Sequence, residues 1–224
     1  MFNQFLWVIF PYLCVVIFIV GHIARFRYDQ FSWTAKSSEF IEKKQLKWGS
    51  LCFHLGIIPV AVGHVVGLLI PAHWLRQLGV NDHLYHIGAV YIGSIFGIIT
   101  LIGMLLLTAR RITIKNIRRL STASDMFVNF LLVCIIIMGC YATIVTNAVT
   151  PTFDYRETIS VWFRGLFYFQ PDDARMITVP LAFKLHIILG FMIMACWPFT
   201  RLVHVWSVPV TYIHRRYIVY RKHK

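Results

Sequence analysis

The stretch that decides the fold reads LAFKLHIILGFMIMACWPFTRLVHVWSVP (residues 181–209), an apolar segment in which His186 and His204 lie eighteen residues apart. An α-helix has 3.6 residues per turn, so eighteen residues complete about five turns. In one continuous helix both imidazoles would point the same way, roughly 27 Å apart along the axis. A hydrocarbon core is ~30 Å thick, so each histidine would lie near one membrane surface and could hold a cofactor there.

The composition of the whole chain indicates a membrane protein. Of 224 residues, 58% are hydrophobic and only 14% are charged, which is too apolar for an ordinary soluble domain. The net charge of +13 does not indicate nucleic-acid binding, because the basic residues fall in blocks between apolar spans, as orientation signals do. The five cysteines form no CxxC pair, which argues against a cysteine-ligated cluster and covalently attached haem.

The apolar runs predict an all-α membrane protein, a five-transmembrane-helix bundle that forms one domain over the whole chain. Each run is near the ~20 residues that a helix needs to cross a bilayer. The longest outer connection predicts a further, amphipathic helix over Ile159–Phe167, lying at the membrane interface. The expected spans are residues 5–24, 51–70, 87–107, 126–145 and 181–203.

The distribution of lysine and arginine predicts the orientation. Of the 22 such residues, 17 lie after the first span, after the third span or at the C-terminal end of the chain. By the positive-inside rule the N-terminus is outside the cell and the C-terminus is in the cytoplasm, with a basic tail at residues 208–224. The expected location is the cell membrane, crossed several times.

The second span carries two more histidines, His54 and His64. Ionisable side chains inside a span are costly and usually functional. Because the second span runs outward and the fifth runs inward, His54 comes level with His204 near the cytoplasm, and His64 comes level with His186 toward the outside. The topology therefore predicts two bis-histidine sites, one above the other.

The spacing of the histidines conflicts with two straight helices. The two histidines of the second span are separated by ~15 Å along the axis, against ~27 Å in the fifth span. Pro59 and Pro198 lie between the paired histidines, so we expect kinks there. Gly56, Gly63 and Gly67 either leave room for a flat macrocycle or allow close helix packing.

Four further residues near the two sites have a functional and an ordinary interpretation. His73, His83 and His86 lie beside the outer site and are candidates for proton handling, whereas a solvated side chain is the ordinary interpretation. Arg201, one turn before His204, pairs with a haem propionate or is a cationic anchor at the inner surface.

Several of these residues resemble those of a known family, the γ subunit of membrane-bound respiratory nitrate reductase, a five-span dihaem cytochrome b. The resemblance covers essentially the whole chain and is most specific in PFTRLVHVWSVP at residues 198–209. It implies two haem b groups: His54 and His204 would ligate the inner iron, and His64 and His186 the outer iron. It also implies a membrane quinol, menaquinol or ubiquinol, as electron donor.

The family's partners are a cytoplasmic molybdenum α subunit and an iron–sulfur β subunit, which takes electrons from the inner haem. The expected function is thus that of the quinol-oxidising subunit of a quinol:nitrate oxidoreductase, with His73, His83 and His86 as quinol-site candidates. One alternative keeps the dihaem core but serves a related heterodisulfide or sulfite-type reductase. Another is a haem-free membrane anchor or transporter whose histidines bind protons or metal.

Overall fold

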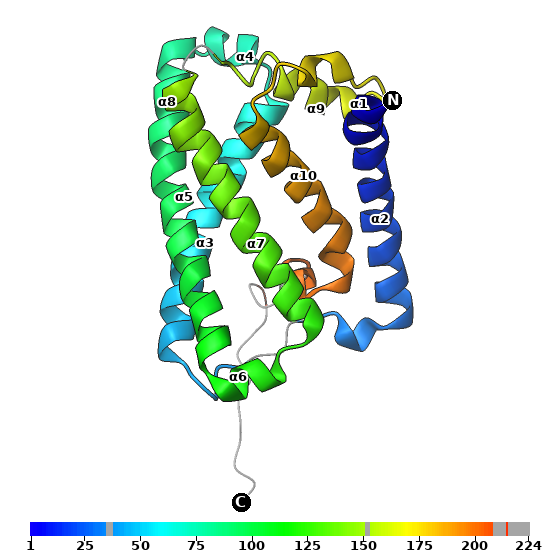
Figure 1. Cartoon of the computed structure of the whole chain (residues 1–224), viewed down its shortest axis with the longest axis vertical. Coiled ribbons are helices and arrows are strands. Elements are labelled where there is room, and N and C mark those ends of the chain that lie inside the picture. Colours follow the sequence, from blue (N-terminus) through cyan, green and yellow to red (C-terminus); the bar gives the residue numbers. More distant parts are fainter. Residues whose placement is uncertain (35–37, 151–152, 208–213, 215–224) are drawn as a thin grey trace, which may run out of the picture.

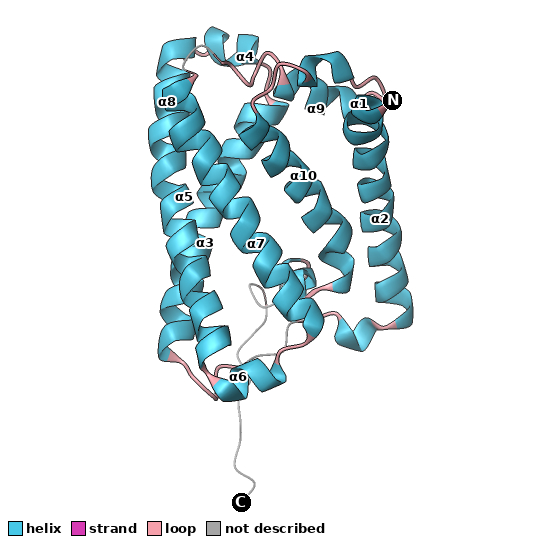
Figure 2. Cartoon of the chain, viewed as in Figure 1, coloured by secondary structure: helices cyan, strands magenta, loops and turns pink. Residues whose placement is uncertain are grey.

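The computed structural model describes residues 1–34, 38–150, 153–207 and 214. Within these residues every regular element is helical (Figure 2). Five helices are long and apolar enough to cross a membrane, so the predicted five-span bundle is confirmed. They cover Phe2–Tyr28, Lys44–Leu69, Asp82–Thr113, Ala123–Thr146 and Leu181–Phe199.

Several spans consist of more than one helical element, and short helices join them at both ends of the bundle (Figure 1). The elements of the spans are α1 (Phe2–Gln4), η1 (Phe5–Ile9), α2 (Phe10–Tyr28), α3 (Lys44–His64), η3 (Val65–Leu69), α5 (Asp82–Thr113), α7 (Ala123–Tyr141), η4 (Ala142–Thr146), α10 (Leu181–Cys196) and η6 (Trp197–Phe199). Two short helices follow the last two spans, α8 (Asn147–Val149) and η7 (Arg201–Val205). The connecting elements are η2 (Gln30–Ser32), α4 (Ala72–Gln77), α6 (Lys115–Leu120), α9 (Ile159–Phe167) and η5 (Asp173–Met176).

Polar caps explain why α5 and α7 begin before the apolar runs that predicted them. The Asn81 side chain accepts a hydrogen bond from the backbone N–H of Leu84 at 2.8 Å and caps α5. Thr122 and Asp125 form a capping box at the start of α7, each accepting from the other's backbone N–H. Both caps satisfy N–H groups that a helix start otherwise leaves without partners.

The fifth span is not the continuous helix expected over residues 181–203. The α-helix ends at Cys196, a 3₁₀ turn contains Pro198, and Thr200 is extended with φ −122° and ψ 177°. Proline has no N–H and its ring clashes with the preceding turn, so an α-helix does not continue through this position without a kink. Pro59, in contrast, lies inside α3 without ending it.

This break corrects the expected geometry of the histidines. His186 lies in α10, whereas His204 lies in η7, beyond the extended residue. The two side chains are therefore not five turns apart on one helix. The separation of ~27 Å expected for a continuous helix does not apply, and neither does its conflict with the ~15 Å of the second span.

Close packing joins α3 to α5. A Cβ atom on Gly56 of α3 would overlap Thr100 of α5, and a Cβ on Gly103 of α5 would overlap the backbone of Phe53. Only glycine allows this approach, so for Gly56 the helix-packing interpretation holds. Figure 1 shows α3 and α5 running side by side, with α10 inclined between α7 and α2.

The amphipathic helix predicted from the apolar positions between Ile159 and Phe167 is confirmed as α9, which covers Ile159–Phe167. Trp162 is 1% exposed, and its Nε1–H donates to the backbone carbonyl of Trp7 at 2.8 Å. Ile159 belongs to the same buried cluster, whereas Phe167 is 62% exposed. Part of the apolar face of α9 therefore packs on the bundle. Helices α4 and α9 lie at the same end as the N-terminus, and α6 lies at the other end (Figure 1).

At the α6 end, a buried arginine of α5 holds the connection between the first two spans. Arg110 donates to the carboxylate of Glu42 at 2.7 Å and to the hydroxyl of Ser38 at 3.0 Å. Glu42 also accepts from the backbone N–H of Gln45 at 2.7 Å, at the start of α3. Desolvation raises the pKa of Glu42, but the hydrogen bonds from Gln45, Arg110 and Leu46 outweigh it, so this pKa lies below its usual value.

Candidate functional site

The four histidines of the second and fifth spans form two facing pairs. The ring centroids of His64 and His186 are 5.9 Å apart, toward the α9 end of the bundle. Those of His54 and His204 are 6.5 Å apart, toward the other end. We call these the outer pair and the inner pair. They are the pairs that the antiparallel topology predicted.

Both separations suit a metal ion held between two imidazoles. A ring nitrogen binds a transition metal at about 2.0–2.1 Å and lies about 1.1 Å from the ring centroid, so two rings across one ion have centroids roughly 6.3 Å apart. The observed values lie on either side of this distance. The described residues contain no group of three or more His, Cys, Asp or Glu suited to a bare metal ion. Two imidazoles would suit an iron whose other ligands come from a porphyrin.

All four imidazoles are held through Nδ1 by a backbone carbonyl oxygen. A carbonyl can only accept, so Nδ1 carries a proton, and in the neutral imidazole the lone pair is then on Nε2. Such a second partner fixes the tautomer and the orientation of a metal-binding histidine. The Nδ1 to O distances are 2.8 Å for His54 with Ser50, 2.8 Å for His64 with Val60, 3.0 Å for His186 with Ile135, and 2.7 Å for His204 with Arg201.

The outer pair is shaped by α7 as well as by the two helices that carry it. The carbonyl that holds His186 belongs to Ile135 of α7. A Cβ atom on Gly139, one turn further along α7, would come within 2.8 Å of the His186 ring. A Cβ atom on Gly63, next to His64, would meet nothing within 4 Å, so there is open space beside this glycine. The sequence pattern did not identify Gly139, because one glycine in an apolar helix carries no distinctive signal.

The inner pair depends on a clamp at the break in the fifth span. Arg25 of α2 donates through Nη1 to the carbonyl oxygens of Pro198 at 2.6 Å and Thr200 at 2.9 Å. Its Nη2 donates to the carbonyl of Ser32 at 2.6 Å. Arg25 therefore satisfies carbonyls that the broken helix leaves open, and it positions the turn that carries His204. In the sequence, Arg25 counts among the basic residues that indicate orientation, and nothing there connects it to His204.

His54 also faces a hollow of about 580 Å³ at the inner end of α3. His54 and His64 are both exposed, so protein side chains do not fill the space beside either ring. The hollow is lined by Glu39, Lys43, Leu46, Lys47, Ser50, Leu51 and His54.

Arg201, the expected propionate partner, makes an ion pair with the protein. Its Nε lies 2.8 Å from a carboxylate oxygen of Asp125, in the first turn of α7. Arg111 approaches the other oxygen of the same carboxylate at 3.8 Å. Arg201 thus ties the segment that carries His204 to α7.

No polar contact of a described residue connects His73, His83 or His86 to the outer pair. His73 and His83 are exposed, and His73 lies edge-on against its neighbour Trp74 at 5.9 Å. Within the described part of the chain, neither His73, His83 nor His86 makes a hydrogen bond or an ion pair. Tyr85, which stands between His83 and His86 in the sequence, does: its hydroxyl lies 2.7 Å from that of Tyr155.

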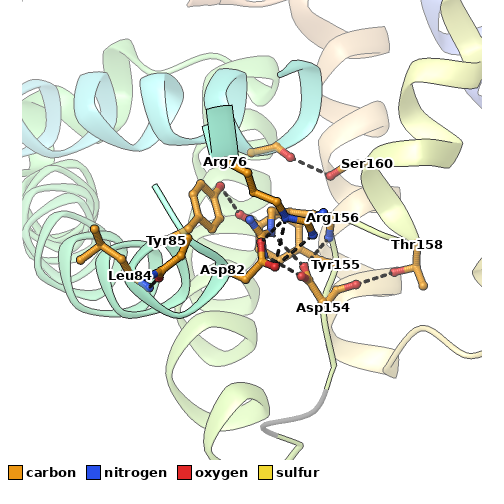
Figure 3. A network of polar contacts seen from close by, with 11 residues as sticks. Arg76, Asp82, Leu84, Tyr85, Asp154, Tyr155, Arg156, Thr158 and Ser160 are labelled. Carbon is orange, nitrogen blue, oxygen red and sulfur yellow. Dashed lines mark hydrogen bonds and ion pairs between the residues drawn. The ribbon is translucent and has the colours of Figure 1, made fainter. Parts of the chain in front are cut away.

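A network of charges holds this outer region together (Figure 3). The Arg156 side chain, only 5% exposed, pairs with Asp154 at 2.8 Å and with Asp82 at 3.1 Å. Asp82 also pairs with Arg76 at 3.0 Å. Burial lowers the pKa of Arg156, but the two carboxylates outweigh it and raise the pKa above its usual value. The network joins the segment before α9 to the start of α5.

Known sequences resemble this chain over nearly its whole length. A profile of the family described as nitrate reductase gamma subunit matches residues 3–223. The nitrate reductase gamma chain of Bacillus subtilis is 47% identical over 222 residues, which span 99% of each chain. The chain belongs to the nitrate reductase gamma subunit family. The respiratory nitrate reductase 2 gamma chain of Escherichia coli is 34% identical over 223 residues, 99% of this chain and 98% of that one.

A longer relative contains the same unit. The nitrate reductase-like protein NarX of Mycobacterium tuberculosis is 41% identical over 222 residues, which are 99% of this chain but 34% of NarX. Membership of the gamma subunit family confirms the resemblance seen in the sequence, and it makes the chain a membrane subunit of an oxidoreductase complex.

Proposed function

We propose that this gamma-family chain binds two haem b groups and carries electrons across the membrane from a quinol to the other subunits of a nitrate reductase. One observation carries the proposal. Each of two imidazole pairs has its Nδ1 protons held by carbonyl oxygens and its ring centroids at the separation of two ligands across one ion. When bound, each haem supplies a one-electron carrier that imidazole alone does not provide.

In this proposal the chain's own residues have separate tasks. His64 and His186 hold the outer iron, and His54 and His204 hold the inner iron. The backbone carbonyls keep the Nδ1 protons in place, so that each ligand is a neutral imidazole with its lone pair on Nε2. The two histidines of α3 are ten residues apart, a rise of about 15 Å, which sets the two sites at different depths.

The outer side is the proposed side of quinol oxidation. Support comes from the aromatic surface at that end, where Phe167 and Tyr168, at the C-terminal end of α9, are exposed and suited to the membrane interface. Protons released by the quinol would then leave to the outside. His73, His83 and His86 stay candidates for handling them, and Arg201 stays a candidate partner for a haem propionate.

The partners are proposed to bind the basic, cytoplasmic side. These are an iron–sulfur β subunit and a molybdenum α subunit, which would dock on the connection at residues 25–47 and on the tail. The tail at residues 208–224 lies outside the described residues, apart from His214. Positive charge concentrates on this side in the sequence, as expected for a face in the cytoplasm.

Visible spectroscopy of the purified complex tests the proposal. We expect a reduced-minus-oxidised spectrum with b-type bands and a haem assay that finds two haems per gamma chain. The variant His73→Ala is a control and should keep both haems. A complex without a b-type band would contradict the proposal and leave the haem-free anchor or transporter. Soluble subunits other than those of a nitrate reductase in the purified complex would identify a related reductase instead.

A further inference from the structure

The Tyr85 and Tyr155 side chains form a hydroxyl pair at the outer end of the bundle (Figure 3). Their oxygens are 2.7 Å apart, and only one of the two O–H groups is needed for that bond. Among the described residues, no acceptor is found for the second O–H group. The pair therefore offers one O–H donor and oxygen lone pairs to a ligand.

The hydroxyl pair lies one helical turn outward from the outer histidines. A Cβ atom on Gly67 would come within 2.6 Å of the Tyr155 hydroxyl and within 2.8 Å of the Tyr85 hydroxyl. Gly67 follows His64 by three residues in the same span. The Tyr155 ring stacks on Phe183 with centroids 6.4 Å apart, and Phe183 precedes His186 by three residues. The pair thus lies between the two helices that carry the outer pair.

Its surroundings hold the hydroxyl pair in place. The Arg156 guanidinium lies 4.3 Å from the centre of the Tyr85 ring, which is an attractive cation–π distance. Arg156 is itself fixed by Asp154 and Asp82. Desolvation by burial raises the pKa of Tyr155, and the neighbouring Tyr85 raises it further, so Tyr155 stays protonated.

Gly67, the glycine next to the pair, is also fixed. The Ser160 hydroxyl, at the start of α9, donates to the backbone carbonyl of Gly67 at 2.7 Å and is fully buried (Figure 3). This bond ties η3 to α9 close to the two hydroxyls. A ligand that reached the pair would meet a preorganised donor and acceptor, which costs less binding free energy than a mobile one.

We propose that the Tyr85–Tyr155 hydroxyl pair binds one hydroxyl of the quinol and positions it beside the outer site. This rests on the proposed function and assigns side chains to the polar end of the substrate. A hydroquinone hydroxyl both donates and accepts, which matches a pair that presents one O–H donor and free lone pairs. The neighbouring charge of Arg156 would also stabilise negative charge that develops on the quinol oxygen as its proton leaves.

The test uses Tyr85→Phe and Tyr155→Phe in the intact complex, because phenylalanine keeps the ring contacts and removes only the hydroxyl. The rate of quinol oxidation is measured against duroquinol concentration, together with the spectrum and midpoint potential of each haem. We expect kcat/KM for duroquinol to fall at least tenfold in each variant, with both haems retained at unchanged potentials. The double variant should lose little more than the single ones, because the hydroxyls act as one unit.

Tyr12→Phe is the matched control. Its hydroxyl donates to the backbone carbonyl of Leu166 at 3.0 Å at the same end of the bundle, away from the outer pair. Its kcat/KM should stay within twofold of the parent value. Unchanged kcat/KM in the Tyr85 and Tyr155 variants would overturn the assignment, as would loss or a shifted potential of the outer haem, since the pair would then serve the cofactor. A parent complex that does not oxidise duroquinol would overturn the proposed function and this inference together.

Discussion

The inner and outer pairs each consist of two histidines held through Nδ1 by backbone carbonyls, but the two pairs differ in how the fifth span supports them. At the outer pair, His186 lies in a regular α-helix and is held by the carbonyl of a neighbouring helix. At the inner pair, His204 lies in a short 3₁₀ turn beyond a break and is held by a carbonyl three residues before it. The ring planes differ as well, at 33° for the outer pair and 77° for the inner pair.

The different supports of His186 and His204 indicate how each site is formed. Regular spans packed side by side build the outer pair, so its geometry depends on close contact with α7. The inner pair needs an irregular segment to be held in one conformation, and a charged side chain of α2 does this. Each site should therefore have its own point of weakness, at a residue that is not a ligand.

The largest expected effect comes from the ligands themselves. Replacing His54 or His204 by alanine should remove the inner haem and halve the haem content per chain, while the outer haem stays. Replacing His64 or His186 should remove the outer haem, because losing one of two axial imidazoles empties or weakens the site. Haem assays and low-temperature difference spectra measure this. Depletion of one common haem by the His54 and His64 variants would contradict the pairing.

The same variants sharpen the comparison through the midpoint potentials. Moving an electron inward, toward the negative side of an energised membrane, costs about 2.3 kcal/mol per 100 mV. A higher potential at the inner site would offset this cost, so the His204 variant should lose the high-potential component of a redox titration. Loss of the low-potential component instead would reverse the proposed direction.

A methyl group on α7 should weaken the outer site alone. In Gly139→Ala the new Cβ would press on the His186 ring, and overpacking of this kind costs about 1–3 kcal/mol. We expect outer-haem affinity to fall by roughly tenfold, with the inner haem unchanged. Gly93→Ala is the control, because its Cβ would meet Thr143 at an ordinary contact distance of 3.5 Å. If Gly139→Ala weakened both haems equally in titrations with hemin, α7 would not support the outer site alone.

Removing the clamp should weaken the inner site alone. Arg25→Gln takes away the charged donor to the carbonyls of Pro198 and Thr200. Hydrogen bonds to a charged group contribute about 1.5–3 kcal/mol, so we expect inner-haem binding to weaken by about 2 kcal/mol. Arg27→Gln, at an exposed position on the same helix, is the control. Retention of both haems at full affinity in Arg25→Gln would show that the turn carrying His204 keeps its conformation without Arg25.

The smallest expected effect concerns the start of the helix that carries His54. The pKa of Glu42 is lowered in the folded protein, so its stabilising contribution is present above its unfolded pKa of about 4.3 and is lost as the pH falls through the lower folded value. Glu42→Gln should therefore melt slightly earlier than the parent at pH 7, and the difference should shrink below pH 4. Glu39→Gln, at an exposed ion pair with Lys43, is the control. A difference in melting temperature that does not depend on pH would contradict this assignment.

Much of the architecture could be predicted from the order of the residues. Hydrophobic runs of bilayer length predicted the five spans, and helical periodicity predicted the helix α9. The alternating direction of the spans predicted which histidines would face each other. These features follow from local composition and chain direction, which need no knowledge of the packing between helices.

The sequence by itself thus determined the number of spans, the histidine pairs and the membership of the gamma subunit family. Only the tertiary structure decided that Pro198 breaks its helix while Pro59 does not, and that Arg25 clamps the break. It also placed Gly139 against His186 and paired Tyr85 with Tyr155. The physical reason is that each of these contacts joins side chains from different elements, and their fit depends on distances between helices that periodicity along one helix does not encode.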